Sequence, residues 1–575
     1  MTSTPADGRP MADTIVVAGL TFRYLGTKRP ALRDLSLTIP PGQICAVLGR
    51  AGAGKTTLCS LLAGFLPTFY DGELSGGVTV DGQDAVALGP EHLVRHVAIV
   101  PSNVLSQISG ARFSVFEEVA FSLENMGLER DTIVERAEWA LDALGIAHLR
   151  DRSPYALSGG QQQRMVIAAA LALRPPVLLL DEPTASLDPP GAADLADLLR
   201  QLASGGTTVV VAEHAVEWTA ALAQRVLLLD DGALVADGTP QTVLGDGGAL
   251  AHGVALPQAA QIARRLAAAG RWPASAAPPV TIAELLAGLR AVPEAAQDAA
   301  VMGALLAGGA DPLAPHQGAL AEGGGPIVEL RAVRYRYPTG VEALRGVSFA
   351  IGRGERVALL GRNGAGKSTA VRHLNGLLRP AGGAVLVAGR DAIKTDVAKL
   401  ARHVGIVFQD VRNQLFARTV RDELRFGPRN LGYPAARVEA LVDAALAALG
   451  LADVADEHPY DLPPSRRRLT AIAAVLAMDP DLLVLDEPTA GLDSAGIGLL
   501  TALVKARAEA GKSALVVSHD LNFCFAALDR VVLLKDGDLA LDAPIAGMGA
   551  AARDLLAETV GLPDGMAAAR ELLAG

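Results

Sequence analysis

Short apolar runs rich in Val, Ile and Leu alternate along most of the chain with longer stretches of helical periodicity. Residues 44–48 and 357–360 are two such runs, and each leads into a glycine-rich turn. Strands that alternate with helices in this way are typical of an α/β domain with a largely parallel sheet. The apolar stretch at residues 168–180 is among the longest, but Arg174 and two prolines interrupt it, so no membrane-spanning helix is predicted.

The same motifs occur twice in the same order, which indicates a duplicated domain. LGRAGAGKTT is answered by LGRNGAGKST, and LLLDEPTASLD is answered by LVLDEPTAGLD. Both repeats close on a strand–turn–strand pattern with an Asp-Gly pair, at residues 231–232 and 536–537, which suits a tight hairpin. We place the first copy at residues 14–246 and the second copy at residues 326–575.

The remaining segments precede or separate the two copies. Residues 1–13 are polar, lack an apolar signal-peptide stretch and are predicted to be disordered. Residues 247–325 are predicted to form a helical extension and a flexible linker. Short Ala/Leu-rich helices are expected at 256–270 and 280–289, followed by the flexible sequence AEGGGP.

Composition narrows the class of protein. Half of the 575 residues are hydrophobic and a fifth are charged, which excludes global disorder. The net charge of −11 argues against a nucleic-acid partner. Because neither a membrane-spanning helix nor a signal-peptide stretch is predicted, we expect a soluble cytoplasmic chain. The three cysteines are scattered without metal-ligand spacing and fit buried thiols in a reducing compartment.

Each copy carries a phosphate-binding loop between an apolar run and a helical stretch, the context that this motif requires. Glycines let backbone N–H groups surround phosphates, and the helix N-terminus adds partial positive charge. The lysine is expected on the β- and γ-phosphates of ATP, and the hydroxyl after it on Mg²⁺. The predicted ATP-binding residues are Gly49, Gly52, Gly54, Lys55, Thr56 and Thr57 in the first copy, and Gly361, Gly364, Gly366, Lys367, Ser368 and Thr369 in the second.

A buried strand ends on two adjacent acids in each copy, Asp181-Glu182 and Asp486-Glu487. The aspartates are predicted to hold Mg²⁺. The glutamates are predicted to orient or deprotonate the attacking water.

With these motifs in place, the sequence resembles the ATP-binding cassette (ABC) family over nearly its whole length. Ser158-Gly159-Gly160-Gln161 matches the family's signature, which binds the γ-phosphate held by the opposite cassette. The resemblance implies two tandem phosphate-loop ATPase domains, each with a mixed sheet core and a helical subdomain. It also implies further residues on the nucleotide: His214 and His519 as catalytic switch histidines, Tyr24 and Tyr337 as aromatic platforms for adenine, and Gln409 on Mg²⁺.

The two copies depart from the family pattern in different places. Ser102 occupies the first copy's position for Gln409, and Pro463-Pro464-Ser465 replaces the signature in the second copy. In the head-to-tail pairing of the family, both departures fall in the site of Lys55. We therefore expect the site of Lys367 and Glu487 to do most of the hydrolysis.

The segments that follow Gln107 and Gln414 resemble those of energy-coupling factor (ECF) importers, and the first of them is particularly like that of their fused two-cassette members. The shared positions are Glu118/Glu423, Phe121/Phe426, Asn125/Asn430 and Gly127/Gly432. This resemblance implies import of a vitamin or metal ion. The chain would be attached to the cytoplasmic face of the membrane through a transmembrane T component and a substrate-binding S component. Two alternatives stay open: a fused ATPase of a sugar importer, and a soluble ABC protein acting on ribosomes.

Overall fold

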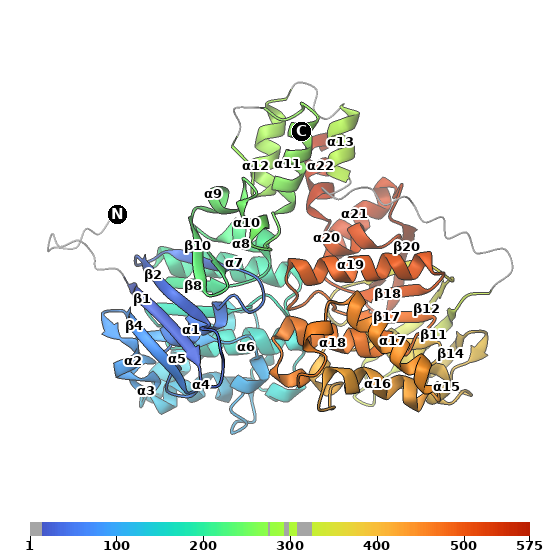
Figure 1. The fold of residues 1–575 in the computed structure, drawn as a ribbon, viewed down its shortest axis with the longest axis horizontal. Coiled ribbons are helices and arrows are strands. Elements are labelled where there is room, and N and C mark those ends of the chain that lie inside the picture. The colour runs from blue at the N-terminus through green and yellow to red at the C-terminus, as the bar shows by residue number, and fades with distance from the viewer. Residues whose placement is uncertain (1–13, 274–276, 293–297, 307–324, 575) are drawn as a thin grey trace. The chain divides into compact units, whose positions relative to one another are not determined.

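The computed structural model describes residues 14–273, 277–292, 298–306 and 325–574. The disorder predicted for residues 1–13 and the flexible end of the linker lie outside this part of the chain. Two compact units make up the structure (Figure 1). Of the described residues, the first unit contains 14–260 and 277–284, and the second contains 261–273 and those from 285 onward.

A six-stranded sheet forms the centre of each copy. In the first copy the strand order is β10-β9-β3-β8-β7-β6, and all neighbours are parallel except the hairpin of β9 and β10. The second copy repeats this order as β20-β19-β13-β18-β17-β16. The strands are β3 (Ile44–Leu48), β6 (Val97–Val100), β7 (Val177–Asp181), β8 (Thr208–Ala212), β9 (Arg225–Asp230) and β10 (Ala233–Gly238), then β13 (Arg356–Leu360), β16 (Val404–Val407), β17 (Leu482–Asp486), β18 (Ser513–Val517), β19 (Arg530–Lys535) and β20 (Asp538–Pro544).

A second, antiparallel sheet belongs to each copy, so the sheet core is mixed as predicted. Its order is β2-β1-β4-β5 in the first copy and β12-β11-β14-β15 in the second. The strands are β1 (Ile15–Tyr24), β2 (Leu32–Ile39), β4 (Gly72–Val80) and β5 (Gln83–Asp84), then β11 (Val328–Arg336), β12 (Glu342–Ile351), β14 (Gly382–Val387) and β15 (Arg390–Asp391).

Three mutually packed helices form the predicted helical subdomain of each copy (Figure 1). The first of them starts sharply because Ser114 caps the N-terminus of α4 and Glu117 reaches back to the capping residue. Thr419 caps α16 by accepting from the backbone N–H of Asp422. The helices are α4 (Val115–Asn125), α5 (Arg130–Ala143) and α6 (Gly159–Ala172) in the first copy, and α16 (Val420–Asn430), α17 (Ala435–Ala448) and α18 (Pro464–Leu476) in the second. The predicted fold class is therefore confirmed.

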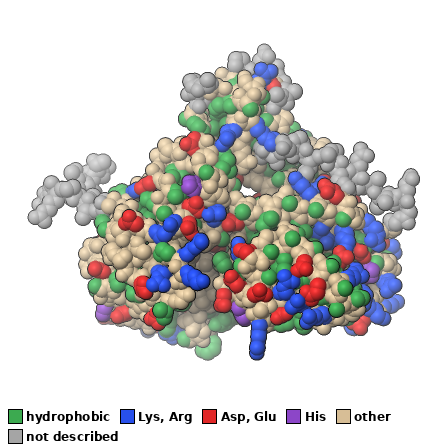
Figure 2. All heavy atoms as spheres, viewed as in Figure 1, with side chains coloured by type: hydrophobic (Ala, Val, Ile, Leu, Met, Phe, Trp, Pro, Cys, Tyr) green, Lys and Arg blue, Asp and Glu red, His purple; other side chains and the backbone are tan. Residues whose placement is uncertain are grey.

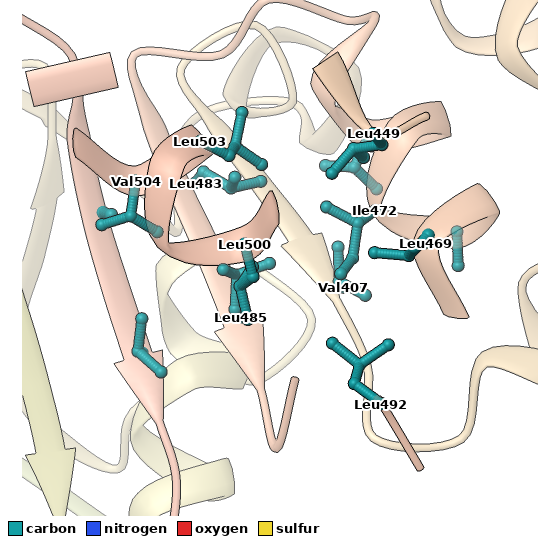
Figure 3. Close-up of a cluster of buried hydrophobic side chains, with 14 of the residues drawn as sticks. Val407, Leu449, Leu469, Ile472, Leu483, Leu485, Leu492, Leu500, Leu503 and Val504 are labelled. Carbon is teal, nitrogen blue, oxygen red and sulfur yellow. The ribbon is translucent and has the colours of Figure 1, made fainter. Parts of the chain in front are cut away.

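Further helices pack on the six-stranded sheets. In the second copy, Leu483 and Leu485 of β17 meet Ile472 of α18 and Leu500 of α19 in one buried cluster (Figure 3). The main helices of this kind are α1 (Lys55–Leu62), α7 (Pro189–Ser204) and α8 (Val216–Leu222) in the first copy, and α14 (Lys367–Leu374), α19 (Ser494–Glu509), α20 (Leu521–Ala527) and α21 (Ala550–Thr559) in the second.

The segment between the copies contains the two predicted helices, α11 (Gln258–Ala268) and α12 (Ile282–Arg290). A third helix that the sequence reading missed, α13 (Ala299–Leu306), packs against α22 (Asp564–Ala574) at the far end of the second copy (Figure 1). Val301 and Leu305 of α13 are fully buried. Helix α13 of the linker therefore shares a packed core with a helix that follows the second copy's last strand.

None of the described helices is long and apolar enough to cross a membrane. Figure 2 shows charged side chains interspersed with hydrophobic ones over the visible face. All three cysteines are buried and free, as the sequence indicated.

Candidate nucleotide-binding sites

The two phosphate loops have closely similar geometry. Each connects a central strand to a helix, β3 to α1 and β13 to α14. Gly54 and Gly366 adopt φ angles of 104° and 101°, and a Cβ at these positions would lie 2.6 and 2.4 Å from a backbone carbonyl oxygen. Only glycine fits there without displacing the backbone.

The lysine of each loop is buried beneath it. Lys55 Nζ donates to the carbonyl oxygens of Gly49 and Arg50 at 2.9 and 3.1 Å. Lys367 Nζ donates to those of Gly361 and Arg362 at 2.6 and 3.1 Å. Both ammonium groups are therefore held at the loop whose N–H groups would surround a phosphate.

A hydroxyl and a buried carboxylate meet below the first loop. Thr56 Oγ1 donates to Asp181 Oδ2 at 2.8 Å, and the buried Oδ1 of Asp181 has no hydrogen-bond partner among the described residues. Burial, with a smaller contribution from the charge of Glu182, raises the pKa of Asp181 to about 6. An orphaned carboxylate oxygen beside a hydroxyl fits Mg²⁺, which prefers oxygen ligands.

The second copy places the equivalent pair together. The Asp486 carboxylate interacts with the Ser368 side chain, and burial raises the pKa of Asp486. Four of the predicted Mg²⁺ ligands, Thr56 with Asp181 and Ser368 with Asp486, are thus paired next to their own phosphate loops. The side chain of Gln409, the fifth, is exposed, and the contact described for this residue is through its backbone carbonyl.

Each glutamate that is predicted to be catalytic lies beside the predicted switch histidine of the same copy. The Glu182 Oε1–His214 Nε2 distance is 3.5 Å, and the Glu487 Oε1–His519 Nε2 distance is 3.4 Å. The backbone N–H of His519 donates to Glu487 Oε2 at 3.2 Å. Burial raises the pKa of Glu487, an environment that suits a general base at neutral pH.

The histidine of the first copy also reaches the phosphate-loop lysine, since Lys55 Nζ lies 3.2 Å from His214 Nε2. An ammonium group can only donate, so this ring nitrogen accepts. Lysine, histidine and glutamate therefore converge at the phosphate end of the first copy's site.

Both glutamates have a left-handed backbone, with φ of 52° at Glu182 and 49° at Glu487. For a residue with a Cβ this conformation costs about 1–3 kcal/mol, and it persists only where the surroundings fix it. One restraint is a hydrogen bond from the glutamate's own N–H to the neighbouring strand. Glu182 N donates to Ala212 O at 2.8 Å, and Glu487 N donates to Val517 O at 2.7 Å.

The predicted aromatic platforms lie next to the loops. Tyr24 OH is 3.2 Å from Thr57 Oγ1, and Tyr337 OH is 3.0 Å from Thr369 Oγ1. A predicted adenine-stacking ring and the second hydroxyl of the phosphate loop are thus joined in each copy.

The signature segment of the first copy opens α6. Ser158 is its N-cap, and Gln161 completes a capping box by accepting from Ser158 N at 3.0 Å. Gly159 and Gly160 begin the helix, so their N–H groups have no carbonyl partner within it.

The aligned helix α18 starts differently, because Pro463 is its N-cap and Pro464 its first residue. Proline carries no N–H, so two of the three backbone donors of the signature are missing. The arginines that follow make contacts within the second copy: Arg466 with Asp453, Arg467 with the carbonyls of Tyr460 and Leu462, and Arg468 with the carbonyls of Glu487 and Gln409.

The contacts of two residues of α18, Arg468 and Leu469, were not foreseen from the sequence. Arg468 donates to Glu487 O at 2.9 Å and to Gln409 O at 3.0 Å, which joins the acidic strand end to the segment of the predicted Mg²⁺ glutamine. Leu469 stands where the first copy has Arg164, and it enters the buried cluster of Figure 3. Aligning the two copies through the acidic pairs reveals both exchanges, although it does not reveal what the new side chains contact.

Comparisons with a family model and with known proteins point to the same family. A family model described as ABC transporter matches residues 32–185 and 344–490. A protein of Streptomyces avermitilis named as an ABC transporter ATP-binding protein is 37% identical over 557 residues, which cover 92% of this chain and 93% of that protein. One of the same description from Methanosarcina acetivorans is 33% identical over 530 residues, covering 92% of this chain and 85% of that protein.

Among solved structures, cbiO1 from Clostridium perfringens, described as part of the ABC transporter complex cbiONQ, is 34% identical. The match covers 40% of this chain and 91% of that one, with a TM-score of 0.37. On the matched family model and the full-length relatives, the chain belongs to the ABC transporter ATP-binding proteins and carries two ABC cassettes.

Proposed function

We propose that this chain hydrolyses ATP to drive an ECF-type importer of a vitamin or metal ion. Its membrane T and S components would be separate chains, and the chain would attach to them at the cytoplasmic face of the membrane. Within it, the site of Lys367 and Glu487 does most of the hydrolysis, and the site of Lys55 and Glu182 binds ATP and turns over slowly.

The chemistry follows from the residues gathered at each loop. Loop N–H groups and the lysine bind the phosphates, and Tyr24 or Tyr337 stacks on adenine. Glu487 takes a proton from the attacking water or orients it, and His519 contacts the γ-phosphate. When bound at Ser368 and Asp486, Mg²⁺ neutralises phosphate charge.

The difference between the N-termini of α6 and α18 carries the proposed asymmetry. In the head-to-tail pairing of the family, Ser158-Gly159-Gly160 completes the site of Lys367, and Pro463-Pro464-Ser465 faces the site of Lys55. Losing one backbone donor to developing negative charge costs about 100- to 1000-fold in rate. Pro464 removes the N–H that Gly159 leaves free in the first copy, and this loss favours slow turnover at the Lys55 site.

An exposed aromatic surface supports a protein partner near the helical subdomain. Phe416 and Phe426 are 61% and 50% exposed and contact each other edge to face. Buried Glu423 fixes the loop that carries Phe416 by accepting from the backbone N–H groups of Phe416 and Ala417 at 2.8 and 2.7 Å. Large apolar side chains held at a surface commonly mark a protein interface, here with the T component.

Nucleotide trapping tests the asymmetry. The full chain with its membrane partners is incubated with a photoreactive ATP analogue, Mg²⁺ and vanadate, and the labelled loop is identified by mass spectrometry. Label should accumulate on the loop of Lys367 and disappear in Glu487→Gln, whereas Glu182→Gln should retain it. Equal vanadate-dependent labelling of both loops would contradict the proposal.

Purification from detergent-solubilised membranes tests the partner. An integral membrane protein should co-purify with the chain and be lost from Phe416→Asp/Phe426→Asp. The matched control is Leu377→Asp, because Leu377 is also an exposed apolar residue of the second copy, at 54%. Co-purification with ribosomal proteins instead would contradict the transport assignment.

A further inference from the structure

A carboxylate next to the switch histidine has changed places between the two copies. In the first copy it is Glu213, immediately before His214, and Ala215 follows the histidine. In the second copy it is Asp520, immediately after His519, and Ser518 precedes the histidine. Each copy thus has one acid beside its histidine, on opposite sides of it in the chain.

In the first copy, Glu213 is 3% exposed and connects two segments. Its Oε1 accepts from the backbone N–H of Thr184 at 3.1 Å and from the Thr184 hydroxyl. Its Oε2 accepts from the N–H groups of His214 and Ala215 at 2.7 and 3.3 Å. One carboxylate therefore joins the loop after the acidic pair to the segment of the switch histidine.

In the second copy, Asp520 reaches the equivalent threonine from the other side. Its carboxylate interacts with the side chain of Thr489 and accepts from Phe523 N at 2.9 Å. The backbone N–H of Asp520 donates to Ser518 Oγ at 3.1 Å. Ser518 occupies the position of Glu213, so a serine hydroxyl at this position now closes the turn around His519. Burial, which outweighs these contacts, raises the pKa of Asp520.

The threonine in question stands two residues after the glutamate with the left-handed backbone, Glu182 or Glu487. A strained conformation is retained where neighbouring contacts fix the chain on both sides of it. The hydrogen bond of the glutamate N–H fixes the strand side, and the threonine–carboxylate contact fixes the loop side.

We propose that Glu213 and Asp520 are equivalent positioning residues. Each ties the threonine after its acidic pair to the switch-histidine segment and thereby holds the neighbouring glutamate against the attacking water. The inference rests on the proposed hydrolytic roles of Glu487 and His519. The longer glutamate side chain serves from the position before the histidine, and the shorter aspartate serves from the position after it.

Transplanting the first copy's arrangement into the second tests this inference on the full chain. Steady-state ATPase activity is compared for Asp520→Ala and for Ser518→Glu/Asp520→Ala. Removing the acid should lower kcat by about 10- to 100-fold while KM for ATP changes little, because misplacing a catalytic group slows the chemical step more than it weakens binding. The double variant should regain a kcat within about threefold of the wild type, a difference in activation free energy of about 0.6 kcal/mol.

Two controls separate the possible failures. Asp538→Ala removes an exposed acid of the same copy and should leave kcat unchanged. Glu487→Gln should abolish turnover; if it does not, the proposed function fails. If it does, and the double variant is no more active than Asp520→Ala, the positioning inference is wrong.

Thermal unfolding of each variant keeps the test decisive. If Asp520→Ala does not fold, the double variant is compared with the wild type directly. A double variant that folds and turns over supports the inference, and one that fails to fold overturns it.

Discussion

Arg468 donates to the backbone carbonyl of Glu487 at 2.9 Å, from a helix whose start has lost the ABC signature. The same guanidinium donates to Gln409 O. The second copy therefore uses a residue of its altered signature helix to brace the strand end that carries Glu487. The aligned residue of the first copy is Gln163, which is buried and uncharged.

Arg468→Gln, which installs the first copy's residue, should weaken this brace. Hydrogen bonds from a charged donor contribute about 1.5–3 kcal/mol each, so the second copy should unfold at a lower temperature. Displacement of Glu487 should lower kcat by about 10-fold. Arg466→Gln is the matched control, because the Arg466–Asp453 pair is largely exposed and contributes little. Unchanged melting and kcat in Arg468→Gln would show that the contact is dispensable.

Two substitutions of Tyr337 should separate the contribution of its ring to ATP binding from that of its hydroxyl. Tyr337→Phe loses only the contact with Thr369 and should bind ATP nearly as well as the wild type. Tyr337→Ala loses stacking worth about 1–3 kcal/mol, or roughly 5- to 150-fold in Kd. Titration with a fluorescent ATP analogue measures both. An equal loss in both variants would assign the effect to the hydroxyl and not to adenine stacking.

His373 should make the second copy sensitive to acid. It is 1% exposed, burial lowers its pKa, and its Nε2 has no hydrogen-bond partner among the described residues. The folded state therefore keeps the ring neutral. Below the unfolded pKa of about 6.5 the unfolded chain binds a proton that the folded chain does not, so stability falls as pH decreases.

His373→Leu installs the residue found at the aligned position Leu61, which is also buried. Its melting temperature should exceed that of the wild type by an amount that grows as pH falls from 7 to 5. His92→Leu, at an exposed position, should not reproduce this trend. A constant difference across the pH range would contradict the prediction.

The packing of α13 on α22 should depend on Leu305. This side chain is fully buried, so Leu305→Ala should cost about 2–5 kcal/mol locally and speed amide hydrogen exchange in α22. Leu306→Ala changes the next residue, which is 41% exposed, and should have little effect. Equal exchange in α22 for the two variants would argue against the packing.

Local motifs explain what could be predicted from the sequence. The phosphate loops, the acidic strand ends and the N-cap of α6 are specified by neighbouring residues, so they could be predicted from the sequence alone. Contacts between distant segments could not be predicted in this way. Nothing in RRRL indicates that Arg468 reaches Glu487 O, and nothing in AEH or SHD indicates that both acids meet the same threonine.

Helix α13 was missed for a related reason. Its sequence lies in an Ala/Gly-rich stretch that read as linker, and its burial depends on α22 from beyond the second copy's last strand. The hydrophobic pattern of a short helix gives little information when its partner is so far away in the chain.

The pairing of α13 with α22 also dictates an order of events during synthesis. A ribosome adds about 5–20 residues per second, so α13 emerges roughly tens of seconds before α22 does. During that interval Val301 and Leu305 are not yet covered by the helix that buries them in the finished protein. A nascent or truncated chain would thus display an apolar patch that chaperones and proteases can recognise, and burial of this patch would mark a chain whose second cassette is complete.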